Sequence, residues 1–264
     1  MRADAYPFFD CDFLAFAHRG GALYPPNLHR ENSRHAFAAA VALGYRYLET
    51  DVHLTADGVL IAFHDNELDR VTDSAGRVAA LPYEIVARAR IGGIDPIPTL
   101  SELLEAFPHE RFNIDAKSDA AVDQLAHTIA EHGAYERVCV SSFGIRRLLR
   151  LRRLLGPRVA SSASSRGIAL NRFAPWLTAV LDSPAPALQM PADHRLFGRD
   201  LRILTDRLVR TVHRHGKQVH IWTVDDETKM EQLIDAGVDG IFTDRPDTLK
   251  SVLQRRDRWT GASS

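Results

Sequence analysis

The stretch FNIDAKSDAAVDQLAHTIAEHGAYERVCVSS, residues 112–142, contains one complete repeating unit of the fold. It begins with a short apolar run, continues into a segment with apolar residues at helical spacing, and ends in a second β-type run. A glycine, Gly133, stands where the helix is expected to end. A strand, a helix and a strand in this order pair as parallel strands through a right-handed crossover, so the stretch predicts a β-α-β unit.

The same alternation continues in both directions along the chain. Eight runs are typical of strands: 14–17, 47–52, 112–115, 138–142, 159–162, 187–190, 218–222 and 240–243. Amphipathic helical stretches lie between several of them, for example at 33–44, 121–133, 205–216 and 226–237. Eight strands that alternate with helices close a (β/α)8 TIM barrel, and 264 residues suit a single barrel. We therefore expect an α/β chain that forms one TIM-barrel domain over residues 1–264.

One segment interrupts the alternation. Residues 66–98 are long for a connection, contain Gly92 and Gly93, and show no clear strand partner. We expect them to form an insertion that lies over one end of the barrel. Residues 163–186 are weakly patterned, so the sequence predicts no well-defined helix there.

Composition narrows the class of protein. Hydrophobic residues make up 45% of the chain and the formal net charge is −1, so no basic excess indicates nucleic acid, and no long basic run indicates an anionic membrane surface. Cys11 and Cys139 have apolar neighbours and are expected to be buried thiols rather than a disulfide. The N-terminus lacks the apolar core of a signal peptide, and no run of about 18 apolar residues indicates a membrane span. We expect a cytoplasmic enzyme without stable membrane insertion.

Glu49 and Asp51 share one face of the predicted strand 47–52, because residues two apart in a strand project to the same side. Near the C-terminal end of a barrel strand, both would reach the mouth where TIM-barrel active sites lie. Two carboxylates about 6 Å apart repel by about 3 kcal/mol at an effective dielectric of about 20. A bound cation or protonation of one acid relieves that repulsion, and oxygen ligands favour Mg²⁺ or Ca²⁺ over zinc. Two solvated acids at a strand end are the alternative.

Asp115 ends the predicted strand 112–115, and Lys117 follows it closely. As a third acid at the same end of the barrel, Asp115 would complete a site for one divalent cation. Lys117 would then be placed to meet a phosphate oxygen. Alternatively, Asp115 caps the next helix and Lys117 is a surface lysine.

Two of the twelve histidines stand apart because each ends a β-type run next to a charged residue. His18 is followed by Arg19, and His64 by Asp65. An imidazole with a pKa of about 6.5 accepts or donates a proton at neutral pH, so two of them on opposite sides of a phosphorus atom would serve as base and acid. Arg19 offers a forked donor that suits phosphate oxygens. Structural roles for the histidines, and an ion pair for Arg19, are the alternatives.

Seven motifs follow one another along the chain: HRGG at 18–21, ENS at 31–33, ETDVHLTADG at 49–58, FHD at 63–65, NIDAK at 113–117, WTVDD at 222–226 and GIFTDRPD at 240–247. In this order they resemble the glycerophosphodiester phosphodiesterase family, over about residues 14–250. Each motif alone is weak. The combination of HRG, E-x-D, HD and the closing W-T-V with T-D-R-P is highly specific.

The resemblance implies a (β/α)8 barrel with a small insertion after the second strand. It also implies hydrolysis of a glycerophosphodiester, such as glycerophosphocholine or glycerophosphoethanolamine, to glycerol 3-phosphate and an alcohol. The implied roles are a divalent cation, Mg²⁺ or Ca²⁺, held by Glu49, Asp51 and Asp115; acid-base catalysis by His18 and His64; and substrate binding by Arg19, Lys117, Trp222, Glu31 and Asn32. A core position capping the barrel is the alternative for Trp222. The expected partner is this small-molecule substrate, and the sequence leaves the oligomeric state open.

Two departures from the family pattern affect these roles. The family usually has glutamate where this chain has Asp115, so the ligand oxygen moves by about one methylene. The stretch ALYPPNLHRENS, residues 22–33, is a few residues longer than its family counterpart. Glu31 and Asn32 are therefore carried over less directly than the other residues, and Ser33 is equally well explained as an N-cap.

Two other functions are compatible with the barrel. A lysophospholipase D or sphingomyelinase D type of enzyme would use the same histidines and acids, and would need an exposed apolar loop or a secretion signal. The apolar stretch PFFDCDFLAF, residues 7–16, better fits a barrel plug or the first strand. A non-catalytic barrel that binds phosphate esters would have no need of two titrating histidines.

Overall fold

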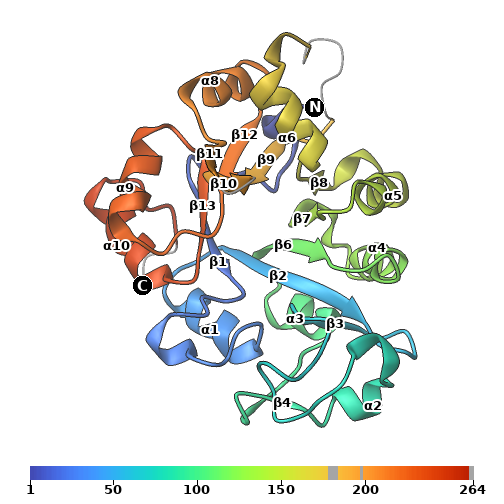
Figure 1. The fold of residues 1–264 in the computed structure, drawn as a ribbon. Helices are drawn as coiled ribbons and strands as arrows, with labels where there is room; N and C mark the ends of the chain where they lie inside the picture. Colours follow the sequence, from blue (N-terminus) through green and yellow to red (C-terminus); the bar gives the residue numbers. More distant parts are fainter. Residues whose placement is uncertain (178–183, 197–198, 262–264) are drawn as a thin grey trace.

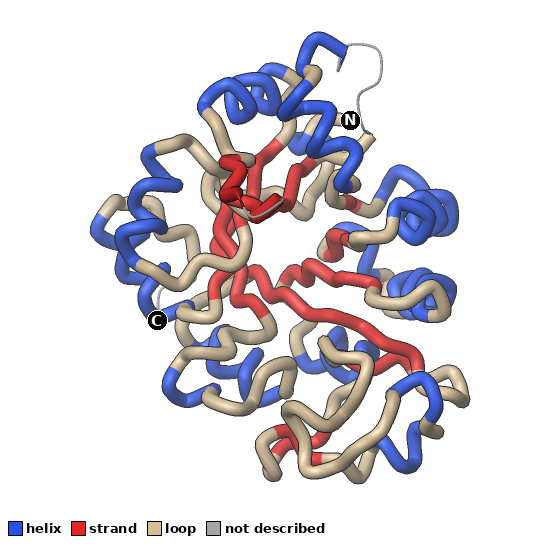
Figure 2. Tube along the Cα trace, in the orientation of Figure 1, coloured by secondary structure: helices blue, strands red, loops and turns tan. Residues whose placement is uncertain are grey.

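The computed structural model describes residues 1–177, 184–196 and 199–261 (Figure 1). Eight parallel strands stand at its centre, and helices surround them (Figure 2). In chain order, the strands are β1 (Leu14–His18), β2 (Tyr47–Leu54), β6 (Arg111–Ala116), β7 (Val138–Ser141), β8 (Ala160–Ser161), β9 (Ala187–Met190), β12 (Gln218–Ile221) and β13 (Gly240–Thr243). Each overlaps one of the eight predicted runs. The prediction of a TIM barrel is confirmed.

The barrel is nearly closed. Around the ring the strands pair in the order β8, β7, β6, β2, β1, β13, β12 and β9. The remaining gap, between β8 and β9, is bridged in parallel by Ser162 and Ala187. The amide of Ala163 also donates to the Ala187 carbonyl at 2.8 Å. This junction is the thinnest part of the wall, because β8 has only two residues.

Eight outer helices surround the sheet within the described residues, and all of them except α6 bury an apolar face against it. They are α1 (Arg34–Ala42), α3 (Leu100–Ala106), α4 (Ala121–Glu131), α5 (Ile145–Leu155), α6 (Ser165–Phe173), α8 (Asp206–Arg214), α9 (Glu227–Asp235) and α10 (Pro246–Arg255). Ser33 caps α1 by accepting a hydrogen bond from the amide of Ala36, as its position suggested. The helix α6 was not predicted, because it buries only Gly167 and Asn171 and so lacks an apolar stripe.

Residues 66–98 form a compact unit beside the second strand of the barrel. The preceding strand β3 (Leu60–Ala62) pairs antiparallel with β2, and the unit contains α2 (Tyr83–Val86), β4 (Arg90–Ile91) and β5 (Asp95–Pro96). Its apolar side chains make a separate cluster that includes Leu68, Val78 and Ile91. The expectation that this segment has no strand partner was wrong, since β4 and β5 pair with each other; strands of two residues leave no alternating pattern to detect.

Aromatic side chains close the N-terminal end of the barrel. Phe16 and Phe242 stack with ring centroids 4.0 Å apart, and Phe8 reaches them from the N-terminal segment. The stretch 7–16 is thus both plug and first strand. Cys11 and Cys139 are free thiols, the latter buried. Across the described ranges, no helix has the length and apolar character needed to cross a membrane.

Candidate active site

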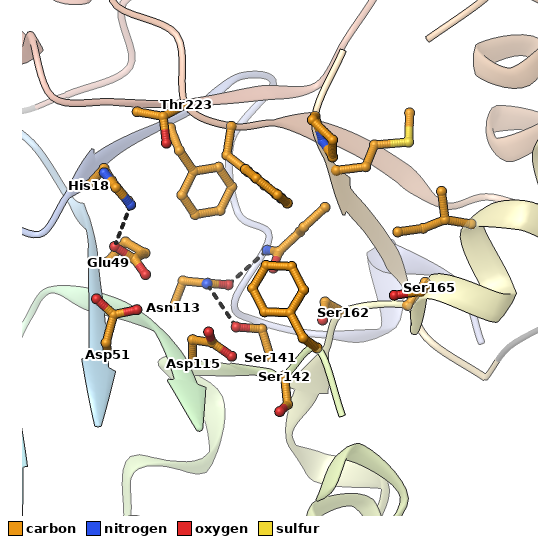
Figure 3. Close-up of a pocket in the computed structure, with 18 of the residues that line it drawn as sticks. His18, Glu49, Asp51, Asn113, Asp115, Ser141, Ser142, Ser162, Ser165 and Thr223 are labelled. Carbon is orange, nitrogen blue, oxygen red and sulfur yellow. Dashed lines mark hydrogen bonds and ion pairs between the residues drawn. The ribbon is translucent and has the colours of Figure 1, made fainter. Parts of the chain in front are cut away.

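The predicted residues meet at the C-terminal ends of the strands. His18 pairs in register with Glu49, and Asp51 with Asp115, so neighbouring strands bring these side chains to the same level. They border a cavity of about 480 Å³ (Figure 3). Of the ten residues predicted for the site, the cavity lining contains His18, Arg19, Glu49, Asp51, His64, Asp115, Lys117 and Trp222.

The HRGG turn after β1 carries two of these side chains. Arg19 has a φ of 52°, and Gly20 and Gly21 continue in the left-handed region at 83° and 88°. A Cβ on Gly20 would lie 2.8 Å from that of Ala36, and one on Gly21 would lie 2.6 Å from Pro246. Only glycine fits at positions 20 and 21 of this turn. The turn places the Arg19 backbone amide 3.1 Å from Glu49 Oε2, to which it donates.

The three carboxylates differ in pKa because their surroundings differ. Burial, followed by the Asp51 charge, raises the pKa of Glu49 to about 7. Burial would also raise the pKa of Asp51, but Lys117 and Arg19 outweigh it and the pKa lies below its usual value. Burial raises the pKa of Asp115 despite the opposing charge of Lys117. The site therefore holds one firmly ionised acid between two that protonate more readily.

Lys117 bridges two of these acids. Its Nζ lies 2.7 Å from Asp51 Oδ1 and 2.8 Å from Asp115 Oδ2. Burial opposes the charge of the ammonium, yet the two carboxylates raise its pKa above the usual value. The lysine is thus a fixed cation at the cavity wall, and it is not the surface lysine considered as an alternative.

His18 lies between two acids. Its Nδ1 is 2.8 Å from Asp244 Oδ1, and its Nε2 is 3.7 Å from Glu49 Oε2. Burial lowers the pKa of His18, but Glu49 and Asp244 together outweigh it, so the pKa lies above its usual value. The hydrogen bond to Asp244 fixes the ring, and Nε2 faces Glu49.

His64 is held by Asp65, and Asp65 is held in turn by an arginine of the 66–98 unit. The Nδ1 of His64 lies 2.6 Å from Asp65 Oδ1. Arg70 donates to both oxygens of Asp65, at 2.5 and 3.1 Å, and to both oxygens of Glu31, at 3.0 and 2.7 Å. Glu31 in turn accepts from Arg19 at 3.1 Å. Arg70 lowers the pKa of Asp65 to about 2, so Asp65 is ionised next to His64.

Glu31 and Asn32 support the site from behind the cavity wall, as judged from the described residues. The side-chain oxygen of the buried Asn32 accepts from the Thr50 hydroxyl at 2.8 Å, and its backbone N–H donates to the Arg19 carbonyl at 2.9 Å. Its φ of 59° is a conformation that asparagine adopts more readily than most residues. Substrate binding by these two residues stays a prediction.

The donor chemistry of the site fits a hard divalent cation. Asp51 Oδ2 and Asp115 Oδ1 are buried oxygens without a hydrogen-bond partner. Within the described ranges, no three acidic, histidine or cysteine side chains form a ready metal cluster. Lys117 takes the position between Asp51 and Asp115, so cation binding would require its ammonium to leave at least one of them.

The rest of the cavity is different in character. Trp222 and Phe143 pack edge to face, with ring centroids 5.8 Å apart. Phe173, Met190 and other apolar side chains continue this wall away from the acids. A cavity that is ionic on one side and apolar on the other can hold a charged group and a less polar group of the same ligand.

Several residues of the site were given no role from the sequence. Asp65 and Asp244 stand inside the FHD and GIFTDRPD motifs, so their position at strand ends was the available signal. On the cavity floor, Gln189 donates to Asn113 Oδ1 at 2.7 Å. Arg70 lies in the segment interpreted only as an insertion, and nothing in its local sequence indicates its partners.

The barrel and the paired acids and histidines at its mouth define an enzyme of the TIM-barrel class. The family model described as glycerophosphoryl diester phosphodiesterase family matches residues 18–248. The chain belongs to this family, and it is a glycerophosphodiester phosphodiesterase.

Known proteins similar to the chain agree with this assignment. The probable glycerophosphodiester phosphodiesterase 2 of Mycobacterium tuberculosis is 41% identical over 257 residues, covering 94% of both chains. The glycerophosphodiester phosphodiesterase of Caldanaerobacter subterraneus is 32% identical and covers 92% of this chain and 98% of its own. The Oleispira antarctica phosphodiesterase, solved in complex with the product sn-glycerol-3-phosphate, has the same fold; its TM-score is 0.75 at 22% identity, with coverage of 91% and 96%.

Proposed function

We propose that this enzyme hydrolyses glycerophosphodiesters, such as glycerophosphocholine or glycerophosphoethanolamine, to glycerol 3-phosphate and an alcohol, with His18 and His64 as the acid-base pair. One observation carries the proposal. Side chains from β1, β2, β6 and the segment after β3 converge on one side of a single cavity, with two histidines, three acids and two fixed cations.

The fixed cations account for binding of the phosphate. Arg19 and Lys117 both line the cavity, next to carboxylates that hold them in place. A phosphodiester anion repels nucleophiles, and its negative charge grows in the transition state. Positive groups that are already oriented stabilise that charge without reorganising.

The two histidines account for the proton transfers. Each has one ring nitrogen bound to a carboxylate, Asp244 for His18 and Asp65 for His64, so the other nitrogen is left for the substrate. One imidazole deprotonates the attacking hydroxyl, and the other protonates the departing alkoxide. Each transfer is typically worth about 10²–10⁴-fold in rate.

Glu49, Asp51 and Asp115 are the residues that would hold one divalent cation, Mg²⁺ or Ca²⁺. Asp51 Oδ2 and Asp115 Oδ1, the two buried oxygens without a hydrogen-bond partner, support this part of the proposal. When bound, such an ion would supply Lewis-acid stabilisation of the phosphoryl oxygens. The aspartate at position 115 is shorter than glutamate, which favours an ion that tolerates irregular distances.

A lipid phosphodiesterase is the second candidate function. The apolar wall with Phe143 and Trp222 favours it, because it offers space for an apolar group on the alcohol side. The lysophospholipase D GDPD1 of Homo sapiens is 26% identical to this chain, with 90% of the chain covered. A non-catalytic barrel would not require a histidine pair in which each ring is held by its own carboxylate.

The test is product release by purified variants. We expect Asp51→Asn or His18→Ala to abolish formation of glycerol 3-phosphate from glycerophosphocholine, with folding intact by circular dichroism. The matched surface changes, Asp123→Asn and His109→Ala, should leave the rate unchanged, since both side chains are exposed. Turnover like wild type in either site variant would refute these roles.

The cation is tested separately. Treatment with a chelator should remove activity, and added Mg²⁺ or Ca²⁺ should restore it. Undiminished turnover after exhaustive metal removal would refute the cation while leaving the histidine roles intact. Substrates with choline, ethanolamine or an acylated glycerol, compared under the same conditions, separate the two candidate functions.

A further inference from the structure

The charges of the chain are distributed unequally. Residues 143–217 contain 15 Lys and Arg but four Asp and Glu, a net charge of +11. The remaining residues contain 18 basic and 30 acidic side chains, a net charge of −12. The overall value of −1 hides this separation, which predicts attraction of polyanions to one half of the molecule.

This basic half is also one half of the barrel in space. The helices α5, α6 and α8 follow one another around one side, opposite α1 and the 66–98 unit (Figure 1). Residues 143–176, from the end of β7 to the turn after α6, contain eight arginines and no acidic residue. We call the solvent side of this segment the basic face.

The outer surface of α5 shows what the basic face presents. Its exposed positions follow helical spacing: Arg146, Leu149, Arg150, Arg153 and Leu154. The opposite positions, such as Leu148 and Leu151, are buried in the core. Leu149 and Leu154 are each 50% exposed, although a helix of a soluble barrel normally places leucine inside.

Aromatic side chains extend this face to the active site. Phe143, Phe173 and Trp176 are 64%, 52% and 68% exposed. Five of the ten large hydrophobic side chains exposed in the described residues lie in this short segment. Phe143 and Phe173 also line the cavity, so the basic face and the cavity mouth are continuous.

Not every arginine of the face is free to bind a partner. Arg150 pairs with Asp123, and Arg152 donates to Ser161. Arg146, Arg153 and Arg166 are exposed and form no ion pair with an acidic side chain among residues 1–177, 184–196 and 199–261. These three present uncompensated charge to the solvent.

We propose that the basic face binds the surface of a bilayer that contains anionic phospholipids, with the cavity mouth at the edge of the contact. Arginine forks match phosphate oxygens, and basic residues near an anionic leaflet are attracted to its negative surface potential. Aromatic and leucine side chains between the arginines would enter the interfacial layer of the bilayer. Duplex nucleic acid has no comparable apolar layer to take up the leucines. The contact is peripheral, and the proposal does not depend on which phosphodiester the enzyme cleaves.

The test uses the full chain and sedimentation with vesicles. Wild type should co-sediment with phosphatidylcholine vesicles that contain about one third phosphatidylglycerol, not with pure phosphatidylcholine, and less in high salt. The double variant Arg146→Glu and Arg153→Glu should bind at least about tenfold more weakly. The matched control, Arg77→Glu and Arg88→Glu, reverses two arginines on the 66–98 unit, exposed at 74% and 71%, and should bind like wild type.

Further measurements keep the result unambiguous. Both double variants should hydrolyse soluble glycerophosphocholine at the wild-type rate, which shows that they fold. Trp176→Phe should lose most of the fluorescence quenching that wild type shows with brominated lipids. The proposal is overturned if wild type ignores anionic vesicles, if the control loses as much binding as the test variant, or if duplex DNA is bound in place of vesicles.

Discussion

Replacing Arg70 tests whether the 66–98 unit takes part in the chemistry. Its guanidinium donates four hydrogen bonds, two to Asp65 and two to Glu31, and these carboxylates hold His64 and Arg19. In Arg70→Gln the charge and the fork are both lost. In Arg70→Lys the charge stays, but an ammonium cannot form two parallel pairs.

The size of the effect follows from exposure and geometry. The side chain of Arg70 is 49% exposed, so solvent weakens its ion pairs and the loss of stability should be about 1–2 kcal/mol. The effect on rate should be larger. If the imidazole and the guanidinium each shift by about 1 Å, a loss of up to about 10²-fold in kcat/KM is expected. We expect about this loss for Arg70→Gln and about tenfold for Arg70→Lys.

The assay is kcat/KM for glycerophosphocholine together with the urea midpoint of each variant. Arg77→Gln is the control, because Arg77 belongs to the same unit but makes a long ion pair. Its Nε lies 3.9 Å from Glu67 Oε1. A purely structural role would lower the midpoint with little change in kcat/KM at a temperature where the protein is folded. That outcome, or equal rates for the glutamine and lysine variants, would refute the reasoning.

Three further predictions concern other parts of the molecule. Asp244→Asn removes a group that raises the pKa of His18, so the limb of the pH–rate profile that belongs to His18 should move to lower pH; an unmoved profile would exclude this pairing. Burial lowers the pKa of His220 to about 3, whereas the unfolded chain takes up this proton near pH 6.5. Its contribution to the free energy of unfolding is thus complete above pH 6.5 and falls by up to about 1.4 kcal/mol per pH unit towards pH 3. As the pH is lowered, the urea midpoint of His220→Gln should therefore fall less steeply than that of wild type. Gly92→Ala should destabilise by about 2 kcal/mol or more, because Gly92 has a φ of 59° and its Cβ would lie 2.7 Å from the His29 carbonyl oxygen; a wild-type urea midpoint would contradict this.

The barrel was predictable because its strands are local features. Each is a short apolar run next to a helical pattern, and eight of them leave few alternatives. Elements without such a pattern were missed. The helix α6 buries Gly167 and Asn171 instead of large apolar residues, and the hairpin of β4 and β5 has two residues in each strand.

For the site, the sequence indicated which residues converge but not how they pair. Residues two apart on one strand, such as Glu49 and Asp51, share a face by geometry alone. Contacts between distant segments follow no local rule. Asp244 lies 226 positions from His18, and Arg70 joins Glu31 across 39 positions. The basic half was overlooked for a related reason, since a net charge sums over the whole chain and carries no position.

The short strand β8 and the bridge from Ser162 to Ala187 make the junction of β8 and β9 a seam in the barrel wall. Glu49, Asp51 and Asp115 lie on β2 and β6, the longest strands of the barrel, which pair with each other over six residues. Beside the seam stand Phe173 and Met190, on the wall that meets the variable part of a ligand. Drift in sequence can therefore remodel substrate preference there while the reacting groups keep their alignment.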